Sequence, residues 1–564
     1  MIIIVSLLLQ LVPDVTSADT ITVQNIMYQV DSNKKLIVII ENANTINQRH
    51  INEKSGIMLD RYYRFNNPVG QIETGISYLA IHPDGTHYTI YFSQIPLVVI
   101  NSPHAIVDEP RVFSEFTLIE PDGHVTHSYM GVEIRGGFSQ TYPKLSLRLE
   151  FWEDSVGNIT KDLSLLGMRN DDDWNLQAMY NEPLRFRSKT SNQLWKQIHT
   201  VYYQEKEPRA VNGIVMEYVE LFLNGEYRGI YALSERIDRK QLQLKKYDGY
   251  IRGELYKAVN WGAPTFNSLP DYNTKDLYWD GFEYKFPEEL VDWVYLYGLL
   301  DFVVNEDDYY FYSDYRRIIE LNNAVDYFIF LNLLRATDNT GKNTFIARYD
   351  YEEPYFIVPW DLDGVFGTMY LGSRDPISTG LLSNGLYDRL IRDCQPEGFH
   401  ETLKQRWNEL RTDVITHQNI MALFQANFDL LTANGAYERE ELAWEEYNFN
   451  RDDLNYLEDW LQARLSYLDE VFNSTCRPVH VSKPKEVRIK IYPNPVVDYM
   501  VVDVRGGVLP FEFSLYNSLG QLVTKKLLRN KKTSLHFTDL QSGMYFIVLQ
   551  NINYRETKKI IVNQ

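Results

Sequence analysis

The chain has 564 residues, enough for three or four domains at about 150 residues each, and its 44% hydrophobic and 14% aromatic residues are typical of a folded protein. A formal net charge of −20 argues against nonspecific nucleic-acid binding, which depends on clustered Lys and Arg. The two cysteines, Cys394 and Cys476, exclude a disulfide framework and a Cys-rich zinc site. Whether these two pair stays open, because positions along a chain do not fix a distance in space.

The first residues, MIIIVSLLLQLVPDVTSADT, read as an apolar run followed by small residues, which predicts an export signal over residues 1–17. A buried first strand is the alternative. No later segment has eighteen uninterrupted apolar residues, so we expect no transmembrane segment after signal removal.

Strands are predicted for most of the first half of the chain. Residues 18–95 alternate in hydrophobicity, with a turn at HPDGTHY, and further strands follow from IPLVVINSPH to KLSLRLEFW. After Pro183 the pattern changes to a helix, and Asn224-Gly225 between two apolar runs predicts a hairpin.

Helices dominate after about residue 290. VDYFIFLNLLRATD is a buried-type helix, TFIARYD and PYFIVPWDLD predict a second hairpin, and residues 396–473 have helical periodicity. A composition break with prolines and lysines predicts a linker over residues 476–487, and alternating strands beyond it predict a separate all-β module.

Four polar residues stand where an enzyme site is expected: Asp338, Asn343, Asp361 and Asp363. Protein kinases place a catalytic aspartate and two magnesium ligands in this order around a hairpin, and the Asp338 to Asn343 spacing equals that of their catalytic loop. The His-Arg pair of that loop is absent. Asp-Asn-Thr-Gly is also an ordinary turn composition, so the spacing alone leaves a plain hairpin open.

A glycine turn with a following lysine forms a second candidate element. Gly136, Gly137 and Ser139 lie between two predicted strands, and Lys144 follows. Backbone N–H groups of such a turn can approach phosphates, and a lysine can neutralise them. The alternative is a hairpin with Lys144 and Arg148 on a solvated face. The acidic run NDDDW at 170–174 is predicted to be a solvated turn, with metal binding as its alternative.

Five blocks of sequence occur in the order of the CotH family and together resemble it: IRGGFSQTYPKLSLRLEF, DDDWNLQAMYNEPLRFRSK, VELFLNGEYRGIYALSERID, GELYKA and LLRATDNTGKNTF…YFIVPWDLDGVFG. The resemblance covers roughly residues 96–475. It implies an α+β fold, namely an atypical protein-kinase-like domain with a β-rich N-lobe and a mainly helical C-lobe, flanked by β regions. It also implies phosphorylation of proteins with ATP and Mg²⁺.

The resemblance implies a role for each matching residue. Asp338 takes the place of the catalytic aspartate, and Asn343, Asp361 and Asp363 take the places of the magnesium ligands. The groups implied to bind the nucleotide are Lys144, Gly136, Gly137, Ser139 and Glu235, with Arg187 and Lys257 as weaker assignments. Two departures are R-G-G-F-S where the family commonly has R-G-N-S-S, and Leu145 where a second lysine is frequent.

The C-terminal module resembles the sorting domain of the type IX secretion system, through IYPNPVVDYMVVDV, FSLYNSLGQLV, LQSGMYFIVL and KKIIV. The resemblance implies export through the periplasm, the sorting machinery as a partner, and release or attachment at the cell surface. An ordinary β-sandwich binding module is the alternative. The predicted divisions are a signal peptide at 1–17, a β-rich region at 18–95, a CotH kinase-like domain at 96–475, a linker at 476–487 and a sorting domain at 488–564.

These expectations combine into an exported enzyme that transfers the γ-phosphoryl group of ATP to Ser or Thr of an unidentified protein. A catalytically silent surface or binding protein is the alternative, because ATP is scarce outside cells and the phosphate-side block deviates from the family pattern. Transfer of a different group from the nucleotide also stays open.

Overall fold

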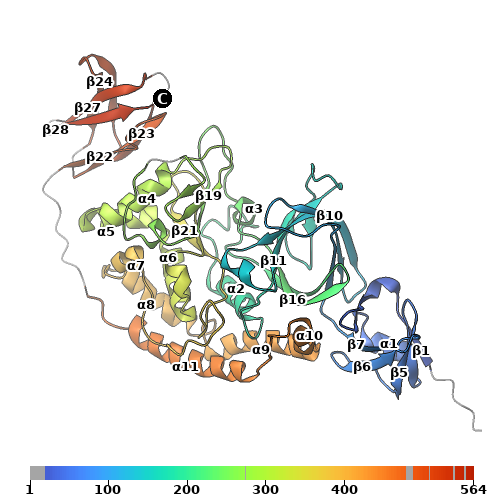
Figure 1. The fold of residues 1–564 in the computed structure, drawn as a ribbon. Coiled ribbons are helices and arrows are strands. Elements are labelled where there is room, and N and C mark those ends of the chain that lie inside the picture. The colour runs from blue at the N-terminus through green and yellow to red at the C-terminus, as the bar shows by residue number, and fades with distance from the viewer. Residues whose placement is uncertain are drawn as a thin grey trace, which may run out of the picture.

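The structure, a computed structural model, describes residues 19–272, 275–477, 487–506, 509–537, 540–551 and 554–563. The predicted signal peptide and most of the predicted linker lie outside the described residues. The α+β fold class is confirmed. An N-terminal β unit, a β-barrel, a region of helices around a small sheet, and an all-β tail follow one another along the chain (Figure 1).

The N-terminal unit is a seven-stranded sheet in the order β1-β4-β5-β6-β7-β3-β2. Strand β3, between β7 and the edge strand β2, is buried at all four positions, as expected for an apolar run between two neighbours. The elements are β1 (Asp19–Thr22), β2 (Tyr28–Asp31), β3 (Leu36–Ile39), α1 (Ala43–Arg49), β4 (Lys54–Met58), β5 (Tyr62–Val69), β6 (Ser77–Ile81) and β7 (His87–Phe92).

The β-rich N-lobe is a closed barrel in the order β10-β11-β14-β16-β15-β8-β9. Asn224 and Gly225 join β15 to β16, both with positive φ, so the predicted hairpin is confirmed. The elements are β8 (Leu97–Asn101), β9 (Val112–Ile119), β10 (Val125–Arg135), β11 (Ser146–Trp152), β12 (Leu163–Ser164), β13 (Asn170–Asp171), β14 (Asp173–Gln177), α2 (Arg187–Ile198), β15 (Met216–Leu223) and β16 (Glu226–Ser234).

The mainly helical C-lobe is built around one helix and one sheet. Every residue from Asn323 to Leu334 of α6 is buried, and the five-stranded sheet β18-β19-β17-β20-β21 packs against this helix through β21. The elements of the sheet region are α3 (Arg239–Leu242), β17 (Glu254–Ala258), β18 (Tyr278–Trp279), β19 (Phe282–Phe286), α4 (Val294–Asn305), α5 (Asp308–Ile318), α6 (Leu321–Leu334), β20 (Thr344–Arg348) and β21 (Tyr355–Pro359).

The remaining helices cover the lower side of the C-lobe (Figure 1). The last helix packs through an apolar stripe, since Leu454, Trp460, Leu461, Leu465 and Leu468 are all buried. These helices are α7 (Gly385–Leu390), α8 (Phe399–Leu410), α9 (His417–Ala433), α10 (Ala436–Ala443) and α11 (Asp452–Phe472). The question of the two cysteines is settled: Cys394, after α7, forms a disulfide with Cys476, after α11.

A buried ion pair joins the N-terminal unit, the barrel and α10. Glu220 of β15 is paired with Arg439 of α10, whose Nε donates to Glu220 Oε2 at 2.8 Å. Ser93, directly after β7, donates its hydroxyl to Glu220 Oε1 at 2.9 Å. Both charged side chains are completely buried, so each depends on the other for compensation.

The tail folds into two sheets, ordered β22-β23-β26 and β25-β24-β27-β28, around its own apolar core. The elements are β22 (Arg488–Tyr492), β23 (Tyr499–Arg505), β24 (Phe511–Asn517), β25 (Leu522–Leu528), β26 (Lys532–His536), β27 (Gly543–Asn551) and β28 (Tyr554–Val562). None of the helices in the described ranges has the length and apolar character needed to cross a bilayer.

Candidate active site

One cavity of about 670 Å³ lies where the barrel meets the C-lobe sheet, a volume in the usual range for small-ligand sites. Residues that the sequence places more than two hundred positions apart share its walls. The structure brings together Gly136, Gly137, Ser139, Lys144, Asp338, Asn343, Asp361 and Asp363.

The loop after β10 forms the barrel side of this cavity. Gly136 has a φ of 113°, and a Cβ there would lie 2.1 Å from Ser139 Oγ, so only glycine fits. A short 3-10 helix, η2 (Phe138–Thr141), follows, and the Gln140 side chain donates to Gly136 O at 2.7 Å. The predicted glycine turn is therefore present as a compact, internally bonded loop.

Lys144 does not point to solvent, which excludes the alternative of a solvated face for this residue. Its side chain is fully buried, and Nζ lies 2.5 Å from both Glu440 Oε1 and the carbonyl of Ile230. Glu440, from α10, also accepts from Arg185 Nε at 3.1 Å and from the Ile230 N–H at 2.7 Å. Burial lowers the pKa of Lys144 to about 7, although the Glu440 carboxylate acts in the opposite direction.

Asn339 fixes the two loops that carry the polar residues of the C-lobe. Its buried amide donates to the carbonyls of Asn343 and Trp360, both at 2.8 Å. Asn343 and Asp361 have φ values of 56° and 57°, a left-handed conformation that is costly outside glycine. Asn339 thus holds two strained residues side by side at the ends of β20 and β21.

Asp361 and Asp363 are close enough for their charges to interact. Burial and, second, the charge of Asp361 raise the pKa of Asp363 well above its usual range. Asn181, from the segment before α2, opposes this effect by donating to Asp363 Oδ2 at 2.7 Å. An amide from the barrel side therefore contacts a carboxylate of the C-lobe across the cavity.

Two cations face Asp361. Arg135, at the end of β10, and Lys257, from β17, lie over the ring of Trp360 at 5.6 and 5.9 Å from its centroid. The charge of Asp361 acts on both. Burial, followed by the charge of Arg135, lowers the pKa of Lys257 to about 8.

Asp338 lies in the short 3-10 helix η4 (Thr337–Thr340), directly beyond α6. Its carboxylate is paired with Lys342 at 2.8 Å, and Lys342 in turn lies 6.0 Å from the ring centroid of the half-exposed Trp261. Both members of this pair line the cavity.

The cavity is richer in cations than the rest of the molecule. Its walls hold seven basic side chains, namely Arg135, Lys144, Arg148, Arg236, Lys257, Lys285 and Lys342. They hold four acidic ones, namely Glu283, Asp338, Asp361 and Asp363. In a chain with a formal net charge of −20, such a local excess favours an anionic ligand.

Glu235 lies elsewhere, and it is not among the described residues that line the cavity. Its buried carboxylate accepts from the backbone N–H groups of Arg169 and Val215 and from the Gln241 side chain. The weaker assignment Arg187 is also buried, in an ion pair with Glu182 at 2.6 Å. Both side chains hold neighbouring segments of the chain together, and neither lines the cavity.

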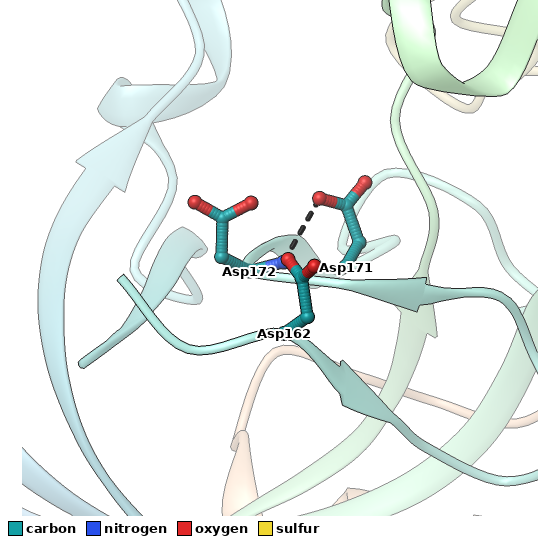
Figure 2. Close-up of side chains that lie close together, drawn as sticks. All are labelled: Asp162, Asp171 and Asp172. Carbon is teal, nitrogen blue, oxygen red and sulfur yellow. Dashed lines mark hydrogen bonds between the residues drawn. The ribbon is translucent and has the colours of Figure 1, made fainter. Parts of the chain in front are cut away.

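The prediction of a solvated turn at residues 170–174 is wrong. Asn170–Asp171 is strand β13, Asp173 begins β14, and Asp171 is buried because Arg169 and Lys240 pair with it. Figure 2 shows Asp162 and Asp172 beside it. Lys240 Nζ lies 2.5 Å from Asp172 and 2.8 Å from Asp171, so a lysine already compensates this acidic cluster.

Sequence reasoning missed three residues that organise the site: Asn181, Asn339 and Glu440. Asn181 and Asn339 lie inside blocks that carried the family resemblance, so the signal was present but not assigned to them. Glu440 lies in the acidic stretch YEREELAWEEY, where nothing local distinguishes it from its exposed neighbours.

Comparison with protein families gives matches for two parts of the chain. Residues 132–468 match the CotH kinase protein family, which is more than half of the chain. The chain belongs to the CotH kinase protein family. Residues 490–563 match the secretion system C-terminal sorting domain. No curated protein matches the chain.

Together, the two matches describe an exported CotH-family protein. The tail directs it through the type IX secretion system, to the cell surface or outside, and implies contact with that machinery.

Proposed function

We propose that this CotH-family protein transfers the γ-phosphoryl group of ATP to a Ser or Thr hydroxyl of another protein. The observation that carries the proposal is the convergence of Lys144, Asp338, Asn343, Asp361 and Asp363 on one cation-rich cavity. Phosphoryl transfer needs positioning and charge compensation more than covalent chemistry from the protein, and these residue types supply both.

Each group has a distinct role in the proposed reaction. Asp338 orients the acceptor hydroxyl and takes its proton while the oxygen forms the new bond to the γ-phosphorus and the bond to the bridging oxygen breaks. Lys342, paired with Asp338, keeps that carboxylate in place. The glycine loop and Lys144 approach the phosphates from the barrel side, and Arg135 and Lys257 add positive charge.

The residues present fit Mg²⁺. Asn343, Asp361 and Asp363 offer the hard oxygen donors that this ion prefers. Burial and, second, the charge of Asp361 raise the pKa of Asp363, and a divalent cation between the two carboxylates would lower it. Bound there, the ion would offset the negative charge of the phosphates.

The decisive experiment compares Asp361→Ala with Asp429→Ala, which removes an exposed carboxylate on α9 that does not line the cavity. Because Asp361 is exposed, its replacement should leave the fold intact, at a cost of about 1 kcal/mol for alanine at this positive φ. We expect Asp361→Ala to lower Mg²⁺-dependent transfer of γ-labelled phosphate about 100-fold or more. Asp429→Ala should retain wild-type transfer. Equal transfer by both variants would refute the proposal.

Two further outcomes separate the alternatives. A thermal shift with Mg·ATP but no labelled acceptor would identify a silent binding protein, because a ligand that binds only the folded state raises the melting temperature. Label transferred from the α-phosphate instead of the γ-phosphate would identify transfer of the nucleotidyl group.

A further inference from the structure

Helices α4 and α5, together with Asp292 before α4, present an acidic face to the tail. Five carboxylates define this surface, here called the α4–α5 face: Asp292, Asp301, Glu306, Asp307 and Asp314. Each has a partner in the tail. Figure 1 shows the tail beside α4 and α5, with its strands β22 and β23 nearest to them.

The polar contacts join groups that are only partly exposed. Lys490 Nζ lies 2.9 Å from Asp301 Oδ2, and the Tyr499 hydroxyl donates to Asp292 Oδ2 at 2.9 Å. Arg505 is buried, pairs with Asp314 and lies 3.5 Å from Glu306. Arg505 also pairs with Asp503 of the tail at 2.8 Å, so the carboxylates of the α4–α5 face add to the compensation of a buried charge.

Alternating side chains of the sheet β22-β23-β26 pack on opposite sides, one side against the core of the tail and the other against α4. In β23, Met500, Val502 and Val504 point into the core of the tail. The intervening Val501 packs instead with Val294 of α4 and with Tyr492, and all three are buried. Because successive side chains of a strand point to opposite faces, the outer face of β22-β23-β26 is built to be covered.

Gly298 supplies independent evidence from the other side of the contact. It lies in the middle of α4, where glycine weakens a helix and no unusual φ requires it. A Cβ at this position would lie 3.3 Å from the Tyr492 hydroxyl and 3.5 Å from Lys532 Nζ. The absence of a side chain at Gly298 leaves space for Tyr492 and Lys532 of the tail. Glycine lowers the stability of α4 but allows the tail to pack close to this helix.

We propose that the α4–α5 face is a receptor surface for the tail of the same chain, so that the sorting domain of the full-length protein is docked in one orientation rather than carried on a free linker. Charge complementarity, the apolar contact around Val294 and the glycine in α4 identify the tail as its occupant. The four-stranded sheet β25-β24-β27-β28 then faces away from the docked surface.

Hydrogen exchange in the full-length protein tests the docking directly. In wild-type protein, amides of α4 and β23 should be protected. Gly298→Leu favours the helix but fills the space next to Tyr492, so we expect exchange in both segments to rise at least tenfold without loss of the fold of α4. Unchanged exchange in both segments would overturn the proposal.

A charge-reversal cycle gives a second readout that does not depend on Gly298. Asp301→Lys and Lys490→Asp should each raise exchange in β23, and the double variant should restore protection because the pair is re-formed with reversed sign. Lys525→Glu is the matched control, since Lys525 pairs with Glu512 inside the tail. Single variants that behave like this control, or a double variant that restores nothing, would overturn the proposal.

Discussion

Lys144 brings a positive charge into a part of the molecule that excludes water. Its pKa of about 7, against an ordinary value of 10.5, means that the folded state holds this proton less tightly than the unfolded chain does. Below pH 7 both states are protonated and the folded state carries the full desolvation cost. Between pH 7 and 10.5 the unfolded chain binds more protons, so stability rises with pH across this window.

Lys144→Met should remove this contribution. From pH 7 to 9 we expect the wild-type free energy of unfolding to gain about 2 to 3 kcal/mol relative to the variant, at about 1.4 kcal/mol per pH unit. Urea denaturation at a series of pH values measures it. Lys525→Met, on the exposed side of the tail, should follow the wild-type profile. Parallel profiles for wild type and Lys144→Met would contradict the prediction.

At the scale of elements, the hairpin β15–β16 contains a β-bulge next to Glu440, the residue that pairs with Lys144 in the cavity wall. The register shifts between Leu221 and Phe222, opposite Gly229, and the N–H of Ile230 turns to Glu440 instead of to a neighbouring strand. A Cβ on Gly229 would lie 2.0 Å from Glu440 Oε2. Gly229 therefore leaves the space that Glu440, the buried partner of Lys144, occupies beside the bulge.

Two glycines of this hairpin form a matched pair of variants. Both have positive φ, but a Cβ on Gly225 meets nothing within 4 Å. We expect Gly225→Ala to cost about 1 to 2 kcal/mol from backbone strain alone. Gly229→Ala should cost about 3 kcal/mol or more in addition, because it displaces a buried carboxylate from its partners. Chemical denaturation checks this, and equal losses would contradict it.

The hairpin also shows what local sequence can predict. Asn224-Gly225 fixed the turn in advance because its conformational preference is local. The closure of the barrel was not predicted, since β8 pairs in parallel with β15 more than a hundred positions away and no local pattern reports such a pairing. The loop aspartates became site candidates through their spacing together with the family resemblance, whereas no local pattern pointed to Glu440, which reaches Lys144 from a helix.

At the scale of the whole molecule, the disulfide closes the C-lobe. It joins Cys394 to Cys476 across a loop that contains α8, α9, α10 and α11. The replacement of both cysteines by serine should lower the free energy of unfolding by about 2 to 4 kcal/mol, mainly because the unfolded chain gains freedom. A reductant should have the same effect on wild-type protein and none on the variant. Unchanged stability after reduction would contradict the prediction.

The contacts of α10 determine how long a fragment of this chain must be to keep its buried ion pairs. Arg439 and Glu440 are neighbours, yet the first is tied through Glu220 to Ser93 of the N-terminal unit, while the second is tied to Lys144 in the cavity. A fragment cut to the family match at 132–468 would begin inside β10 and lack β8 and β9. It would open the barrel and remove Ser93 from the buried Glu220–Arg439 pair. The family match is thus shorter than the piece of chain that closes the barrel and completes this buried contact, which reaches back to Ser93.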